Sequence, residues 1–193
     1  INKAAEYKIE GAGDAAIEVL GNDSEDVRVA AVYAIRELKD AARAPRLADE
    51  LKKADFTKNS NYVEAMLMTL GDFKHVELKD FLIEKFKDSD TTQNFRIAIL
   101  LFLGRSECTA AREFLLEVFK DENEDLTIRS YAVNALARIN DKESGPEILK
   151  TINSIEAMSF AERKKYYNFY MYCVTALTRL GDSAAFDKLM DSL

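Results

Sequence analysis

The sequence has no tryptophan, one histidine, two cysteines, two prolines and seven glycines among its 193 residues. So few prolines and glycines predict few turns, because these residues supply the backbone conformations that tight turns need. Apolar residues make up 48% of the chain, which is enough to form a sizeable buried core. Long elements joined by few turns indicate an all-helical protein. No run approaches about 18 consecutive apolar residues, so the sequence contains no membrane-spanning helix.

The charge balance is acidic, with 34 acidic and 27 basic residues and a net charge of −7. A field of this sign repels polyanions, which disfavours nucleic acid and anionic membranes as partners but leaves room for a local basic patch. Cys108 and Cys173 lack C-x-x-C spacing, and each is expected to be a buried, reduced thiol. The chain starts at Ile1 rather than Met, which suggests a processed protein or an excised piece; the localisation stays unknown.

The sequence repeats itself at a period close to 33 residues. Lys79–Asp88 (KDFLIEKFKD) and Arg112–Asp121 (REFLLEVFKD) share six identical residues at an offset of 33. Glu25–Asp40 and Leu126–Asp141 share a second pattern at an offset of 101, which is about three such periods. Periods of this length with helical patterning are typical of proteins built from stacked helical repeats.

The repeats can be aligned on the last aliphatic residue of each first helix. This residue is Leu38, Leu70, Leu103, Ile139 and Leu180 in the five repeats. A large aliphatic residue stands three positions earlier in every case, which makes a helical core stripe. Eight positions before the anchor stands an aromatic residue in four repeats, namely Tyr62, Phe95, Tyr131 and Tyr172. The alignment therefore predicts one ladder of rings that pack between neighbouring repeats.

Cap and turn residues divide each repeat into two helices. First helices are expected near residues 25–39, 60–71, 91–104, 124–140 and 160–181. Second helices are expected near residues 44–54, 75–87, 107–120, 145–153 and 183–192. Ser159–Glu162 and Ser144–Glu147 are predicted capping boxes, and Asp90 is the predicted cap of Asp90–Gln93. Gly71 and Gly181 are predicted helix stops.

Asp23–Lys53 (DSEDVRVAAVYAIRELKDAARAPRLADELKK) resembles the HEAT repeat, and especially its phycobilisome-lyase-like variety. The arginine of the family's first helix is matched by Arg28 and Arg129, and the aspartate of its intra-repeat turn by Asp40, Asp72, Asp141 and Asp182. Three repeats depart from the pattern at the arginine, with Ser60, Gln93 and Tyr170, and one departs at the aspartate, with Arg105.

The resemblance implies an all-α fold, a right-handed alpha-alpha superhelix that forms a HEAT-like solenoid of about five to six helix pairs. Residues 1–193 then make a single HEAT-like domain. Its repeats fall at roughly residues 1–22, 23–55, 56–88, 89–121, 122–157 and 158–193. The first of these is a worn repeat, because Gly13–Leu20 echoes Gly181–Leu189.

Five aromatic residues gather within Tyr166–Tyr172, where a base-stacking platform, a membrane-seeking face and ordinary core are the competing interpretations. Phe169 belongs to a helical core stripe and Tyr172 to the ladder, so both are assigned to the core. Tyr166, Tyr167 and Tyr170 are additional rings. Residues 166 and 167 are about 100° apart around a helix, so one stripe cannot bury both. We expect these rings to cover the end of the solenoid or to contact another protein, and the net acidity disfavours base stacking despite the adjacent Glu162–Lys165.

Phe81 and Phe114 form a second candidate, because both lie 11 residues after their anchors. The HEAT resemblance implies that second helices line a concave face, where a partner groove would lie. Packing of both rings between repeats is the favoured alternative. Lys79 and Arg112, each nine residues after its anchor, would form a modest cationic rim together with Lys52 and Lys53.

Catalytic signatures are scarce. His75 is the only histidine, so histidine metal clusters and paired-histidine dyads cannot form within the chain. The sequence contains no GxGxxG, Walker or GxSxG motif, and no cofactor or metal is predicted. The leading hypothesis is a non-enzymatic protein–protein interaction scaffold for a protein or peptide partner, without nucleic acid.

Two alternatives stay open. The resemblance also implies HEAT-like enzymes of a bilin-lyase-like or DNA-glycosylase-like kind. The resemblance to bilin lyases lies in the repeat itself and identifies no active-site residue in this sequence. A DNA glycosylase would need a basic groove with an exposed aromatic residue. The chain could also be an excised segment of a longer HEAT array, because Phe186–Leu193 ends it without a polar cap. Apolar end helices would then favour end-to-end self-association.

Overall fold

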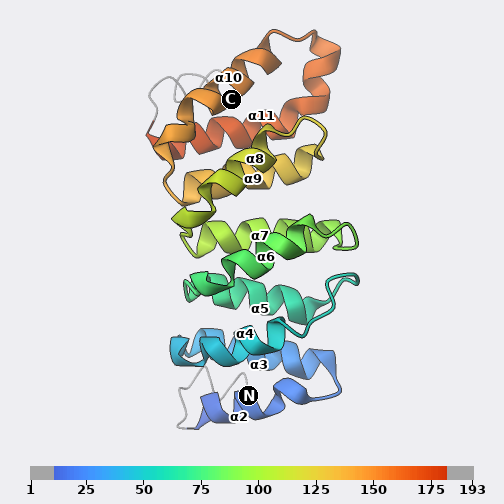
Figure 1. Ribbon diagram of the computed structural model, residues 1–193, viewed down its shortest axis with the longest axis vertical. Helices are drawn as coiled ribbons and strands as arrows, with labels where there is room; N and C mark the ends of the chain where they lie inside the picture. Colours follow the sequence, from blue (N-terminus) through green and yellow to red (C-terminus); the bar gives the residue numbers. More distant parts are fainter. Residues whose placement is uncertain (1–10, 182–193) are drawn as a thin grey trace. The chain divides into compact units, whose positions relative to one another are not determined.

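The computed structural model describes residues 11–181, which are α-helical apart from short turns and 3-10 segments. Ten α-helices lie in this range: α2 (Ala12–Glu18), α3 (Glu25–Glu37), α4 (Ala44–Leu51), α5 (Asn61–Asp72), α6 (Lys79–Lys87), α7 (Gln93–Arg105), α8 (Arg112–Lys120), α9 (Leu126–Arg138), α10 (Gly145–Glu156) and α11 (Phe160–Leu180) (Figure 1). No strand occurs between residues 11 and 181, and the all-α prediction is confirmed. The helix predicted near 183–192, Asp182 and the first ten residues lie outside the described part.

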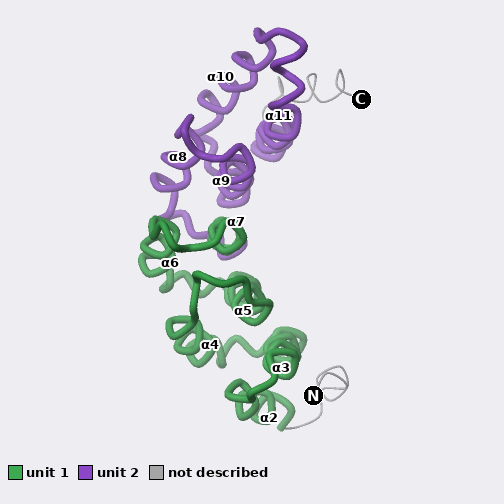
Figure 2. The backbone as a smooth tube through the Cα atoms, turned by 90° about the vertical axis from the view of Figure 1, so that its right-hand side faces the viewer, with its two compact units in different colours: residues 1–102 green, residues 103–193 purple. Residues whose placement is uncertain are grey.

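The chain divides into two compact units, residues 1–102 and residues 103–193 (Figure 2). In the first unit, α3 packs against α2 and α5, and α4 packs against α5. In the second unit, α9 packs against α8 and α11, and α10 packs against α11. Within each unit, first and second helices alternate along the chain, as the sequence predicts. A short 3-10 segment precedes each of the second helices α4, α6, α8 and α10.

The core of each unit includes one fully buried aliphatic position on the second helices. It is occupied by Leu47, Leu82, Leu115 and Ile148. Cys108 and Cys173 are buried free thiols, as predicted. Burial raises the pKa of Cys173 to about 12, so this thiol stays protonated near neutral pH.

The first helices share one C-terminal backbone conformation, which fixes the register of the repeat. Lys39, Lys74, Glu107 and Asn140 all adopt left-handed backbone conformations, with φ between 53° and 58°. The next residue in each case donates its N–H to a carbonyl five positions earlier, on Ile35, Leu70, Leu103 and Leu136. These four residues are therefore equivalent. Gly181, with φ of 82°, takes the same place after α11. The sequence alignment on Leu38, Ile139 and Leu180 was therefore displaced by three residues, because positions three apart share a helix face.

The corrected register splits the predicted aromatic ladder into two positions. Tyr62, Phe95 and Phe169 share one position, whereas Tyr131 and Tyr172 share another, three residues further along. The Tyr131 and Tyr172 rings lie 5.7 Å apart between centroids. Phe95 packs instead against Phe56, with centroids 5.4 Å apart. The prediction of one continuous ladder was wrong for the same reason as the alignment.

The corrected register also reassigns the repeat arginine. Arg96, and not Gln93, is the equivalent of Arg28 and Arg129, and Val63 rather than Ser60 occupies the position in α5. Arg96 donates from Nε to the carbonyl of Phe86 at 3.3 Å, and Arg129 donates from Nε to the carbonyl of Phe119 at 3.0 Å. Both carbonyls lie in the last turn of a second helix, where backbone acceptors lack helical partners. The arginine therefore closes the end of the preceding helix.

The predicted caps are confirmed at one box and wrong at the other. The Ser159 hydroxyl accepts from the Glu162 N–H, and the Glu162 carboxylate accepts from the Ser159 N–H, which completes the capping box of α11. The Ser144 hydroxyl instead donates to the Asp141 carbonyl at 2.7 Å, because a 3-10 turn leads directly into α10.

Two further end signals need correction. Thr92, rather than Asp90, caps α7 by accepting from the Phe95 N–H at 3.4 Å. Gly71 lies inside α5, and the left-handed residue that follows this helix is Lys74. Asp72 therefore precedes the turn, and its carboxylate forms an ion pair with the Arg36 guanidinium at 2.5 Å. Gly181, with φ of 82°, ends α11 as predicted.

Candidate functional site

The two phenylalanines proposed for partner binding are mostly covered. Phe114 is 8% exposed. Phe81 is half-buried and meets the Phe56 ring edge-on, with centroids 6.1 Å apart. Phe114 is buried, and Phe81 packs against another ring of the first unit, which leaves little ring surface for a partner on α6 or α8.

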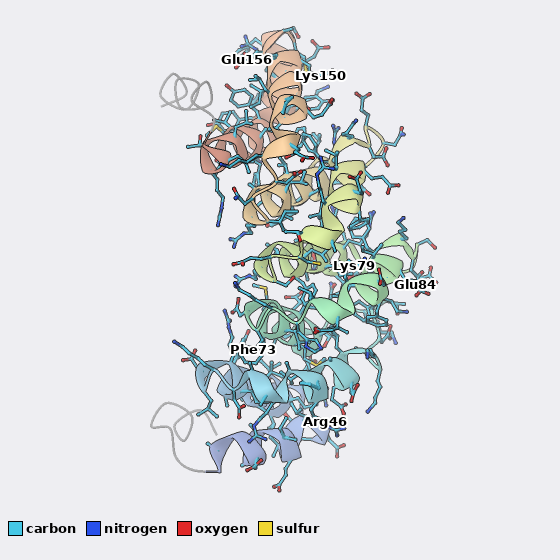
Figure 3. All side chains as sticks on the ribbon, turned by 60° about the vertical axis from the view of Figure 1, so that its left-hand side comes forward. Arg46, Phe73, Lys79, Glu84, Lys150 and Glu156 are labelled. Atoms are coloured by element: carbon cyan, nitrogen blue, oxygen red, sulfur yellow. The ribbon has the colours of Figure 1, made fainter. Side chains whose placement is uncertain are left out.

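The proposed cationic rim is engaged in intramolecular ion pairs. Arg112 pairs with Asp141 at 2.9 Å, with Glu143 at 3.2 Å, and with Glu113. The hydrogen bond to Asp141 is the main reason why the pKa of Arg112 is raised. Lys79, at the start of α6 (Figure 3), pairs with Asp80 at 2.8 Å.

The remaining rim lysines are paired as well. Lys52 lies 4.0 Å from Asp49, and Lys53 lies 3.2 Å from Glu50. The pairs of Lys52, Lys53 and Lys79 are near the surface, where such contacts contribute little to stability.

The aromatic stretch at residues 166–172 separates into core and surface. Phe169 is 2% exposed. Tyr172 is half-buried and hydrogen-bonded to Tyr131, and burial raises the pKa of its hydroxyl. The half-buried Tyr170 donates a hydrogen bond from its hydroxyl to Oε1 of Glu156 at 3.0 Å. Glu156 lies at the end of α10 (Figure 3). Tyr166 is half-buried, whereas Tyr167 is 57% exposed. Tyr167 is thus the predicted tyrosine that offers its ring to solvent.

Sequence reasoning missed Phe160, which is 81% exposed. It opens α11, which has 21 residues against 13 in α9. In the corrected register Leu126, the first residue of α9, is equivalent to Tyr167, so the first two turns of α11 have no counterpart in α9. The sequence could have indicated this exposure, because Phe160 directly follows the Ser159 cap and so precedes the part of the helix that packs against its neighbours.

Phe160, Arg163, Lys164 and Tyr167 form one exposed surface, here named the α11 face. Their spacing of i, i+3, i+4 and i+7 places them on the same side of the helix. Two rings therefore flank two cations. Arg163 and Lys164 form no ion pair with any residue of the described range 11–181.

The charge of α11 opposes that of the chain. This helix carries four cations, Arg163, Lys164, Lys165 and Arg179, and one carboxylate, Glu162. The hydrogen bond from the Ser159 hydroxyl lowers the pKa of Glu162, so the carboxylate stays ionised within the capping box. The chain as a whole has a net charge of −7. The α11 face is consequently a local basic patch on an acidic protein.

A groove of about 230 Å³ lies between α9 and α11. It is lined by Asn134, Ala137, Met171, Tyr172, Thr175, Ala176 and Arg179. Met171 and Thr175 follow Tyr167 at successive steps of four residues, so the groove continues the α11 face along the helix. Both walls are first helices, whereas the family resemblance implied a partner groove on second helices.

A larger cleft of about 540 Å³ lies in the first unit, where the ends of α4 and the starts of α3 and α5 meet. The Arg28 guanidinium lies 5.0 Å from the centre of the Tyr62 ring and donates to the Asn22 carbonyl at 2.6 Å. Burial raises the pKa of Tyr62 to about 12. Lys53 pairs with Glu50, and Lys58 lies 3.9 Å from Asp55. Both lysines of this cleft are therefore paired with carboxylates that line it.

Within residues 11–181, no group of three or more His, Cys, Asp or Glu side chains is arranged to hold a metal ion. None of the helices described is both long and apolar enough to cross a membrane.

The family model of the PBS lyase HEAT-like repeat matches residues 128–154. The chain contains a HEAT-like repeat. A search of curated proteins gives no match. The HEAT-like repeat spans most of α9 and α10, and it includes Arg129 and Asp141, which the sequence resemblance had singled out. Through α9 the HEAT-like repeat supplies one wall of the groove.

Proposed function

We propose that the chain is a non-enzymatic interaction scaffold that binds a carboxylate-rich protein or peptide segment along the α11 face. The observation that carries this proposal is the exposure of Phe160 and Tyr167 on either side of Arg163 and Lys164. A HEAT-like repeat supports a scaffold role, because stacked repeats present extended surfaces for partners. The fold alone assigns no chemistry.

The two residue types on this face favour different parts of one partner. Burying an exposed phenylalanine side chain is worth about 2 kcal/mol, so an apolar partner surface gains from covering Phe160. Arg163 and Lys164 would orient carboxylates and accelerate association. Aromatic residues and arginine are enriched at protein interfaces. An acidic segment with interspersed apolar residues satisfies the rings and the cations together.

Polyanions suit the α11 face less well. Nucleic acid binding gains most of its affinity from many cations that track the phosphates. Here the cations cluster on one helix of a chain whose net charge is −7, so the long-range field opposes a polyanion. A short acidic segment can contact the basic α11 face without lying along the acidic remainder of the surface.

The test is a selection of random 12-residue peptides on the immobilised chain, followed by fluorescence anisotropy with the selected peptides. We expect enrichment of Asp and Glu together with apolar residues. Reversing the face with Arg163→Glu and Lys164→Glu should weaken binding on the order of 30-fold, because two attractive contacts become repulsive. Added salt should weaken binding to the unmodified chain.

The matched control is the double variant Lys52→Glu and Lys53→Glu, which reverses two exposed cations in the first unit. It should leave peptide affinity within about threefold. Selected peptides without acidic residues, or equal binding to both reversed variants, would refute the proposal. Tighter binding of a single-stranded oligonucleotide or of phosphatidylserine vesicles, lost on reversal of the α11 face, would also refute it and assign the face to a polyanion.

A further inference from the structure

We infer that the groove between α9 and α11 is an anchor socket for one apolar side chain of the acidic segment, with a carboxylate of that segment paired to Arg179. This inference rests on the proposed function and adds the position and chemistry of the partner's main anchor. It places the anchor between two first helices of the second unit.

The size of the groove favours a side chain over a small-molecule ligand. Its volume is about 230 Å³. Sites for cofactors and drug-sized ligands commonly measure about 300–1,000 Å³. Interface hot spots, in contrast, are small pockets that one large residue of the partner fills.

The lining has an apolar deep end. Ala137 and Ala176 are 3% and 2% exposed, and their methyl groups leave space that larger side chains would occupy. Met171 and Tyr172 are half-buried beside them. A methionine thioether adapts to side chains of different shape, so the socket can accept an aliphatic or an aromatic anchor.

The rim is polar and carries one cation. Arg179 is exposed and has no ion-pair partner among residues 11–181. Asn134 adds a half-buried amide from α9. An apolar centre with a charged rim is the usual arrangement of a protein-binding surface. A guanidinium without an ion-pair partner in the described range favours a carboxylate next to the anchor residue.

The socket and the α11 face form one path along the helix. Tyr167, Met171, Thr175 and Arg179 succeed one another at intervals of four residues, so neighbouring members lie on adjacent turns. Phe160 and Arg179 are separated by about 28 Å at the helical rise of 1.5 Å per residue. An extended segment of about nine residues covers that length, so a single short peptide can occupy both regions.

The test uses the intact chain with ¹³C-labelled methionine methyl groups, because Met171 lines the socket. The probes are N-acetyl-L-phenylalanine, its uncharged amide, and N-acetylglycine. We expect N-acetyl-L-phenylalanine to shift the Met171 signal with millimolar affinity, the amide to bind several-fold more weakly, and N-acetylglycine to leave the signal unchanged. Assignment follows from loss of the signal in Met171→Leu.

Two ring insertions serve as a matched pair. Thr175→Phe places a ring at an exposed position of the groove, and Asn153→Phe places one at an exposed position on α10 outside it. Thr175→Phe should abolish the Met171 response and weaken binding of the selected acidic peptides about tenfold. Asn153→Phe should change neither measurement.

The outcomes separate the socket from the proposed function. If no probe shifts the Met171 signal and the peptides bind Thr175→Phe normally, the socket is refuted. Peptide binding to the Arg163→Glu/Lys164→Glu variant then still tests the proposed function. If Met171 responds and Thr175→Phe blocks the response, but peptides bind the Arg163→Glu/Lys164→Glu variant normally, the groove binds apolar side chains and the acidic-partner proposal is refuted.

Discussion

Replacing Phe169 with Ala should lower the free energy of unfolding by about 3–5 kcal/mol, the cost of removing a large side chain from a packed core. The ring is 2% exposed, its centroid lies 5.9 Å from that of Phe119, and the Arg129 guanidinium lies 4.7 Å from its centre. Tyr167→Ala, two residues earlier, should change the same quantity by less than about 0.5 kcal/mol, because its ring faces solvent. Urea denaturation followed by circular dichroism measures both.

A second substitution keeps this prediction testable if Phe169→Ala does not fold. Phe169→Leu retains an apolar side chain and should cost less than about 1.5 kcal/mol. Similar losses for Phe169→Ala and Tyr167→Ala would mean that the assignment of core and surface on α11 is wrong. The proposed docking face would then lose its main support.

Replacing Arg129 with Ala should destabilise the second unit by about 2–4 kcal/mol. The side chain is 8% exposed, and its Nε donates to the Phe119 carbonyl at 3.0 Å. Its removal leaves a buried carbonyl without its donor and removes the cation from the Phe169 ring, and each loss costs about 1–3 kcal/mol. Thermal or urea unfolding of the variant checks the value.

Arg96→Ala is the matched control, because Arg96 occupies the equivalent position in α7. Its side chain is half-buried and its bond to the Phe86 carbonyl is longer, at 3.3 Å. The expected loss is about 1 kcal/mol. Because the two compact units need not unfold together, each variant is judged by the transition that it displaces. A larger loss for Arg96→Ala than for Arg129→Ala would contradict the role assigned to the buried guanidinium.

The sequence predicted the helix pairs because apolar periodicity and the 33-residue offset reflect the packing of each helix. It did not predict the register. Lys39, Lys74, Glu107 and Asn140 adopt left-handed conformations, although three of these four residues belong to types that rarely do. Without that signal, Leu38 was as good an anchor as Ile35, since aliphatic residues three positions apart share a helix face. The missed Arg96 follows from the same displacement.

The sequence located part of the exposed aromatic surface. Tyr166, Tyr167 and Tyr170 were predicted as additional rings because adjacent aromatics cannot share one stripe, and Tyr167 is the one of the three that is exposed. Phe160 was missed, since its exposure depends on the extra N-terminal turns of α11 that have no counterpart in α9. The groove has no local signature: Ala137 and Ala176 form its deep end only because packing brings α9 and α11 together. Arg112 looked available in the sequence, but its three carboxylate partners emerge only in the fold.

Hydrogen–deuterium exchange of the intact chain, with and without the tightest selected acidic peptide, tests most directly where a partner binds. The expected result is slower exchange in residues 160–179 of α11 and in residues 134–137 of α9, with little change in α4 and α6. Protection confined to α4 and α6, with α11 unchanged, would contradict docking on the α11 face and its groove.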